Sequence, residues 1–171
     1  MKKAAVYRFA RIILTAIYLF AAALMQCSVF PHIRLLSVIP DFALCAVVCV
    51  SCFEEKRVFA VLAVAVGFLL DIAGAATYVI SPVLFLLSAV IACVMSEKFP
   101  SLRLLSAAAG TFFGSALSSV ICAAILKTKG APFFEAVLHT ALPQLLYTAI
   151  VFAPVYLLTK LHYTVFRNEK R

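Results

Sequence analysis

The fold class is decided by one unbroken apolar stretch, VFAVLAVAVGFLL at Val58–Leu70. A strand of a transmembrane β-barrel alternates apolar and polar side chains, and this stretch does not. Similar continuous runs occur at Leu84–Leu87 and Val90–Met95. Because every backbone amide in lipid must be satisfied within the protein, these runs predict an all-α bundle of transmembrane helices.

The composition of the whole chain supports this interpretation. Of its 171 residues, 65% are hydrophobic and 13% are charged. A soluble domain of this length could not bury so much apolar surface, so we expect a single integral membrane domain over residues 1–171. A membrane-spanning helix needs about 20 residues. The chain has room for six spans, expected at Ala10–Val29, Val38–Phe53, Val58–Ala76, Thr77–Ser96, Leu102–Leu126 and Leu138–Lys160.

Lysine and arginine residues predict the orientation of these spans. With the N-terminus inside, twelve basic residues fall on the inner side and only Arg34, Lys127 and Lys129 fall on the outer side. Basic loops stay in the cytoplasm, so this asymmetry predicts that both termini are cytoplasmic. The net charge of +8 therefore indicates topology and contact with anionic membrane lipid, and not a nucleic-acid partner.

Two segments have alternative interpretations. Cys49-x-x-Cys52 has the spacing of a metal or redox site, but no histidine or acid in the same run completes one. We therefore expect these cysteines to be small packing residues, and we predict no metal or cofactor. The run Ile12–Met25 follows two lysines as in a signal peptide, and we expect it to remain as an uncleaved first helix.

Two acids lie inside the expected spans. Asp41 follows Pro40 at the outer start of the second span, and Asp71 lies near the outer end of the third, shortly before Gly74. Asp41 lies 13 residues before Glu54, and Asp71 lies 14 residues after Arg57. At about 1.5 Å per residue, both acids are roughly 20 Å from the hairpin that joins the two spans. We therefore expect the acids at the same level of the membrane.

The two acids differ in their expected electrostatic setting. A helix N-terminus favours the charge of Asp41, whereas Asp71, near a helix C-terminus, needs a partner, a proton or a chain break at Gly74. Ionisable residues within a membrane are candidate functional sites. Three interpretations stay open: capping and bundle assembly with His32 or Arg34 nearby, a ligand or proton site, and a partner contact.

The fifth expected span carries a face of small residues that includes Ser106, Gly110, Gly114 and Ser118. Small residues let helix backbones approach closely, so Gly110 and Gly114 predict a helix–helix contact. The contact is either within this bundle or with the helix of a partner.

In the sixth span, Pro143 and Pro154 predict kinks, and Gln144 should find a polar partner. The sequence contains no nucleophile with a paired base, no phosphate-binding loop and no HExxH zinc motif. We therefore expect that the protein is not an enzyme.

The middle of the chain, at about Val38–Ser96, carries a more specific pattern. Ile39-Pro40-Asp41-Phe42 opens one span, and after the charged break Glu54–Arg57 the segment GFLLDIAG at Gly67–Gly74 closes the next. This pattern resembles the MreD family of rod-shape-determining proteins, in which a Pro-Asp opens one span and a glycine-containing run ending in Leu-Asp, then Gly, closes the next.

The resemblance implies a non-enzymatic scaffold in the bacterial inner (cytoplasmic) membrane, within the machinery of cell elongation and lateral peptidoglycan synthesis. The implied partners are a bitopic MreC-like membrane protein, the peptidoglycan polymerase and transpeptidase pair and, indirectly, the MreB cytoskeleton. The family is also similar in fold to the substrate-binding S-components of energy-coupling-factor vitamin transporters, which gives an alternative function. An S-component should line its pocket with polar and aromatic groups, whereas this chain has no Trp and few polar residues in its spans.

Overall fold

The computed structural model describes residues 2–33, 38–74, 79–128 and 133–168, and the elements within these ranges are all helices. Two short 3-10 turns lie at Phe30–His32 and Pro100–Leu102. The α-helices are α1 (Lys2–Ser28), α2 (Phe42–Ser51), α3 (Lys56–Ala73), α4 (Ser81–Lys98), α5 (Arg103–Thr128) and α6 (Phe133–Asn168). Each of the six expected apolar ranges therefore overlaps one α-helix, and only α2 lies wholly within its range.

The helices have the length and surface of a membrane protein. Within the described residues, four stretches are long and apolar enough to cross a bilayer: Tyr7–His32, Ser81–Lys98, Pro100–Ile125 and Leu142–Val165. Large apolar side chains cover the outside of the bundle, with Ile150 70% exposed. Such a surface suits lipid and not water. The expectation of an all-α membrane protein is thus confirmed.

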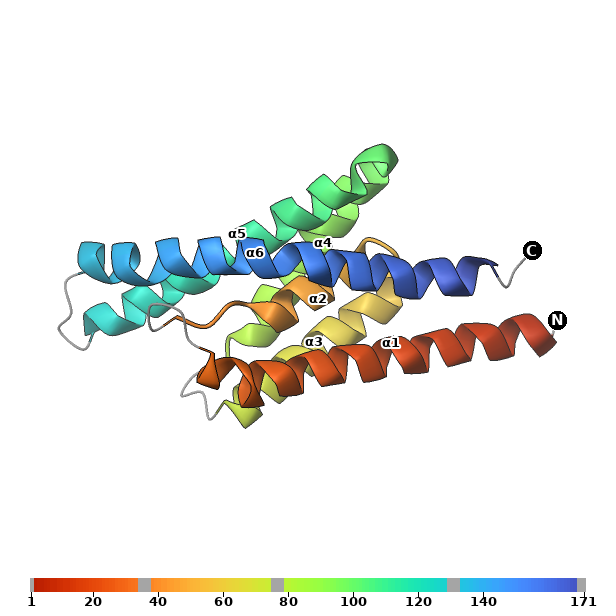
Figure 1. The fold of residues 1–171 in the computed structure, drawn as a ribbon, viewed down its shortest axis with the longest axis horizontal. Coiled ribbons are helices and arrows are strands. Elements are labelled where there is room, and N and C mark those ends of the chain that lie inside the picture. The colour runs from red at the N-terminus through yellow and green to blue at the C-terminus, as the bar shows by residue number, and fades with distance from the viewer. Residues whose placement is uncertain (1, 34–37, 75–78, 129–132, 169–171) are drawn as a thin grey trace.

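Successive helices run in alternating directions along the bundle (Figure 1). The start of α1 and the end of α6 lie at the same end, together with the α2–α3 and α4–α5 connections. We call this end the basic end, because Arg8, Arg11, Lys56 and Arg103 lie at the helix ends that meet there. The opposite end holds the start of α2, the end of α3 and the start of α4.

The second helix occupies the centre of the bundle. All residues from Ala43 to Ser51 are buried, and α2 contacts each of the other five α-helices. Its 10 residues extend about 15 Å, which is half of the roughly 30 Å hydrocarbon layer. The helix is thus shorter than the expected span Val38–Phe53.

Proline explains the late start of α2. Pro40 disfavours helical backbone in the residue before it, and the amide of Phe42 donates to the Pro40 carbonyl oxygen at 2.9 Å in a tight turn. Pro40 is itself fully buried. Non-helical backbone at membrane depth is tolerated where protein surrounds it, and the bundle provides this cover.

Glycines permit the closest contacts between helices. A Cβ atom on Gly67 would collide with the backbone of Pro82, so α3 and α4 meet backbone to backbone at this point. The expected site residues Gly110 and Gly114 lie on the face of α5 that packs against α4 and α2. A Cβ on Gly110 would lie 2.7 Å from the Ala92 Cβ and 2.9 Å from the Ser88 carbonyl oxygen. The small-residue face of α5 is therefore used inside the bundle.

Candidate functional site

A cavity of about 140 Å³ lies where the start of α2, the end of α3 and the start of α4 meet. Half of its lining is polar, and Asp41 and Asp71 both contribute to it. The two acids, which residue counting places at one level, therefore face the same space. The other polar side chains are those of Gln26, Ser81 and Ser118, and the remaining lining comes from Leu44, Leu70, Leu84, Phe85 and Gly114.

Asp71 is held by the first residue of α4. Its carboxylate accepts a hydrogen bond from the Ser81 backbone amide at 3.1 Å and a second, short one from the Ser81 hydroxyl. The side chain is buried, with only 7% of the residue exposed. Asp71 thus caps the N-terminus of α4, whose dipole favours a negative charge. Of the partner, proton or chain break expected for Asp71, the structure shows a partner, Ser81.

The end of α3 is ordinary in conformation. Gly74 is the C-terminal cap of the helix, with φ −80° and ψ 0°, and its amide donates to the Leu70 carbonyl oxygen at 2.7 Å. This backbone is accessible to other residues, and an added Cβ would come within 2.9 Å of the same carbonyl. Gly74 therefore ends the helix, and Ser81 supports the charge of Asp71.

Asp41 lies at the N-terminal cap position of α2 but makes no capping hydrogen bond with its side chain. Its carboxylate accepts a hydrogen bond from the Gln144 amide at 2.9 Å, and its backbone amide donates to the Thr148 hydroxyl at 3.2 Å. Of the interpretations left open for Asp41, the structure shows a contact within the bundle and no cap: the side chain turns to α6. This pairing also gives Gln144 the polar partner expected for it.

The neighbours expected for Asp41 lie elsewhere. The imidazole of His32 pairs with the Ser28 carbonyl oxygen at 2.8 Å within its own segment. Arg34 lies outside the described residues. The polar neighbours of Asp41 come instead from α6, more than 100 residues along the chain, and from α5.

Further polar side chains connect α5 and α6 to this site. The Ser119 hydroxyl donates to the Gln144 side-chain oxygen at 2.9 Å. Ser115 on α5 is fully buried, and its hydroxyl lies beside the Asp41 carboxylate, to which it can donate. On α1, the Gln26 side-chain oxygen accepts from the Ala43 amide at the first turn of α2. Five helices therefore supply polar groups around the cavity or the Asp41 carboxylate.

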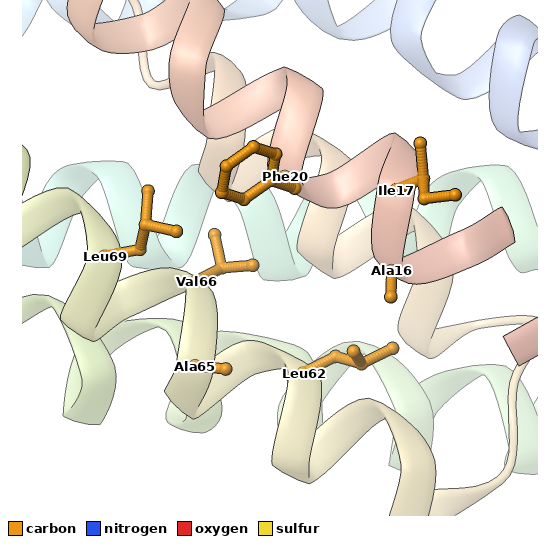
Figure 2. Close-up of a pocket in the computed structure, with 7 residues that line it drawn as sticks. All are labelled: Ala16, Ile17, Phe20, Leu62, Ala65, Val66 and Leu69. Atoms are coloured by element: carbon orange, nitrogen blue, oxygen red, sulfur yellow. The ribbon is translucent and has the colours of Figure 1, made fainter. Parts of the chain in front are cut away.

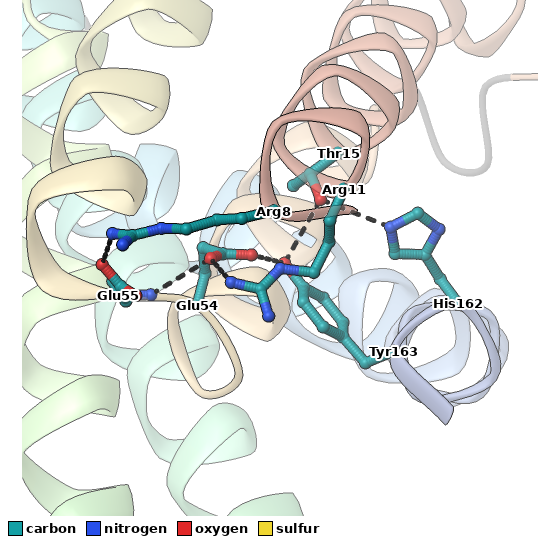
Figure 3. Close-up of polar contacts among 7 residues, drawn as sticks. All are labelled: Arg8, Arg11, Thr15, Glu54, Glu55, His162 and Tyr163. Carbon is teal, nitrogen blue, oxygen red and sulfur yellow. Dashed lines mark hydrogen bonds and ion pairs between the residues drawn. The ribbon is translucent and has the colours of Figure 1, made fainter. Parts of the chain in front are cut away.

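A second polar cluster joins the helices at the basic end (Figure 3). Glu54, in the α2–α3 connection, has a side chain that is 0% exposed. It accepts from Arg11 Nη2 at 2.6 Å and from the Tyr163 hydroxyl at 2.9 Å, which ties α1 and α6 to the connection. The Thr15 hydroxyl lies 3.3 Å from the His162 ring nitrogen and 3.4 Å from the Tyr163 hydroxyl.

Two exposed ion pairs surround the buried Glu54. Arg8 pairs with Glu55, and Lys56 Nζ pairs with Glu97 at 2.9 Å, which links α3 to α4. The hydrogen bond to Glu97 and its negative charge raise the pKa of Lys56 above its ordinary value. Nothing in the sequence pattern distinguished the buried Glu54 from its exposed neighbour Glu55, because both belong to one charged turn.

An open apolar groove of about 350 Å³ runs between α1 and α3 (Figure 2). Ala16, Ile17 and Phe20 line it from α1. Leu62, Ala65, Val66 and Leu69 line it from α3. The groove offers no polar group for orienting a ligand, whereas the cavity at Asp41 and Asp71 does. We therefore take the polar cavity as the candidate functional site.

The cysteines form no metal site in the described part of the chain. No group of three or more His, Cys, Asp or Glu side chains comes together there. Cys45 and Cys49 are 0% exposed and belong to the hydrophobic core around α2.

The architecture and the site define an all-helical membrane protein with a buried carboxylate pair in a polar cavity. No family model, curated protein or solved structure matches the chain.

Proposed function

We propose that the protein is a non-enzymatic scaffold of the bacterial cell-elongation machinery, similar to MreD. One observation carries this proposal. The two segments on which the resemblance rests, Pro40-Asp41 and Leu70-Asp71, line one cavity although they lie about thirty residues apart in the sequence. Segments of a shared family pattern are expected to converge in space when they serve one purpose.

The proposed topology has six crossings with both termini in the cytoplasm and the basic end at the inner surface. The positions of the α1 start and the α6 end support it, because an even number of crossings returns the chain to the same side. The segment Val38–Asp41 adds about 13 Å to the 15 Å of α2, which brings that crossing close to the hydrocarbon thickness. α3 is as long as α4, at 18 residues, and its charges lie near its two ends.

The scaffold would act by passive binding within the inner membrane. Packing and interhelical hydrogen bonds supply affinity between helices in lipid, so an MreC-like protein with one transmembrane helix is the proposed direct partner. The peptidoglycan polymerase and transpeptidase pair, and indirectly MreB, would join the same assembly. Since α4 and α2 occupy the Gly110 and Gly114 face, such a helix would bind elsewhere on the lipid-facing surface.

The alternative function, an S-component of a vitamin transporter, is disfavoured by the size of the cavity. Pockets for small organic ligands usually measure about 300–1,000 Å³. The polar cavity measures about 140 Å³, and the larger groove between α1 and α3 has almost no polar lining.

Depletion of the protein in its rod-shaped host tests the proposal. Depleted cells should become round and lose lateral wall synthesis, measured by incorporation of a fluorescent D-amino acid. An MreC-like protein should co-purify with the tagged chain from detergent-solubilised membranes. Normal shape together with lost uptake of a vitamin would replace the scaffold with the transporter component.

A further inference from the structure

The two helices that form the apolar groove, α1 and α3, both begin in strongly basic sequence. The segments Lys2–Arg11 and Glu54–Arg57 together carry six basic and two acidic residues. Even with Glu97 of α4 counted, positive charges at this level exceed negative ones by three. We propose that the groove holds one acyl chain of an anionic phospholipid, whose phosphate lies at the charged level beside Arg57.

The depth of the groove suits the acyl chains of one leaflet. On α1 its lining begins at Ala16, 8 residues beyond Arg8. On α3 it begins at Leu62, 5 residues beyond Arg57, and ends at Leu69. At about 1.5 Å per residue, the groove therefore lies roughly 8–18 Å from the charged level. One leaflet contributes about 15 Å of the hydrocarbon layer, so an acyl chain whose headgroup lies at the charged level reaches the groove.

The charge complementarity is carried by Arg57. Its neighbour Lys56 pairs with Glu97, and Arg8 pairs with Glu55. Arg57 is exposed and takes part in none of the ion pairs between described residues. A guanidinium group matches the geometry of a phosphate and binds it through two hydrogen bonds. The groove has no polar lining of its own, so the headgroup would be held at the charged level and the chain by apolar contact.

The lining favours an acyl chain over the helix of another protein (Figure 2). Helices associate in lipid through small residues that let their backbones approach. Of the seven lining residues only Ala16 and Ala65 are small, and Ile17 and Phe20 are 57% and 49% exposed. A flexible hydrocarbon chain can follow such a surface. At about 350 Å³, the groove also reaches the volume that is usual for small organic ligands.

The test uses tryptophan fluorescence, because the chain contains no Trp and one introduced Trp reports on one place. Phe20→Trp puts the reporter in the groove, and Phe113→Trp puts it on the exposed face of α5 as a control. The purified full chain is reconstituted in bilayers of equal phosphatidylglycerol and phosphatidylcholine content, with quenching bromine atoms on the chains of one lipid or the other.

Brominated phosphatidylglycerol should quench the fluorescence of Phe20→Trp more strongly than brominated phosphatidylcholine does. One basic side chain near an anionic headgroup corresponds to about a five-fold preference. Arg57→Gln should remove this preference, and Lys160→Gln, which removes an exposed charge from α6, should leave it unchanged. In Phe113→Trp, Arg57→Gln should have no effect on quenching.

Equal quenching of Phe20→Trp by the two brominated lipids would overturn the inference, and so would a preference that Arg57→Gln leaves intact. The same preference at Phe113→Trp would mean only general attraction to anionic lipid, and no quenching at Phe20→Trp would mean that a second copy covers the groove. Should Phe20→Trp fail to fold, Ile17→Trp repeats the measurement from the same groove. The assay uses purified protein, so its outcome is separate from that of the cell-shape experiment.

Discussion

Asp71 and Ser81 are joined by two hydrogen bonds, so that a carboxylate near the C-terminus of α3 caps the N-terminus of α4. The unfavourable end of one helix dipole is thereby compensated by the favourable end of the next. A backbone contact at Gly67 and Pro82 fixes the same two helices deeper in the bundle. One acid and one glycine therefore fix the α3–α4 pair at the end where Asp71 lies.

We expect Asp71→Asn to destabilise the protein more than Asp41→Asn does. The Asp71 carboxylate accepts a backbone and a hydroxyl hydrogen bond at the N-terminus of α4, whereas Asp41 faces the side chains of Gln144 and Ser115 and caps no helix. Loss of a buried, charge-assisted bond costs about 1–3 kcal/mol. The difference is measured as the free energy of unfolding in detergent. Ser81→Ala removes the hydroxyl bond but keeps the backbone bond, so it should destabilise the protein less than Asp71→Asn does. If Asp71→Asn and Asp71→Leu both leave unfolding, protein level and cell shape unchanged, the acid has no structural or functional role.

Gly110→Ala should destabilise the bundle by about 1–3 kcal/mol through overpacking. The added methyl group would meet the Ser88 carbonyl oxygen, which belongs to the rigid backbone of α4. Gly114→Leu should lower the yield of folded protein because Leu44 and Ser88 leave no space for a side chain. The lipid-facing Val120→Leu is the control, since Val120 is 46% exposed. Equal yields of all three variants, measured by size-exclusion chromatography, would refute an internal packing role.

Glu54→Ala should be the most harmful substitution at the basic end. It leaves Arg11 without its carboxylate, and breaking a buried ion pair costs about 3–5 kcal/mol. Glu55→Gln removes the same charge from a pair that is half exposed and should change stability by less than about 1 kcal/mol. Chemical or thermal unfolding of Glu54→Ala and Glu55→Gln measures the loss of stability that each variant causes. The double variant Arg11→Met, Glu54→Leu should recover part of the loss, and equal effects of the two single variants would contradict the burial argument.

The six-crossing topology predicts which positions react with membrane-impermeant thiol reagents. Cysteines introduced at Lys3 and Asn168 should be shielded in intact cells, and one at Lys129, which lies outside the described residues, should be labelled. The background needs only Cys27 and Cys122 replaced, because the other four cysteines are buried. Labelling of position 168 from outside would exclude an even number of crossings.

The general arrangement could be predicted from the sequence because it depends on local properties. Apolar runs located the helices, and counting 1.5 Å per residue from Glu54 and Arg57 placed Asp41 and Asp71 at the same level. Both acids do line one cavity. The late start of α2 follows from Pro40, whose effect on the helix depends on backbone sterics that a hydrophobicity pattern does not contain.

The partners of the polar residues could not be predicted in the same way. Asp41 meets Gln144 across 103 positions, and Glu54 meets Tyr163 across 109. Such pairs depend on which helix faces pack together, and the broad apolar surfaces of membrane helices give little periodic signal for this. Asp41 is the clearest instance, because its side chain contacts α6 and does not cap α2.

The burial of α2 has a consequence for how the protein is made. A helix of 10 residues preceded by non-helical backbone cannot rest stably in lipid alone, because the amides around Pro40 would lack cover. That cover comes partly from α6, which follows α2 in the chain and leaves the ribosome later, through Thr148 and Gln144. Until α6 arrives, the nascent chain must keep α2 in the insertion machinery or at the membrane surface. The order of synthesis thus makes the arrival of α6 the step that lets α2 settle in the bilayer.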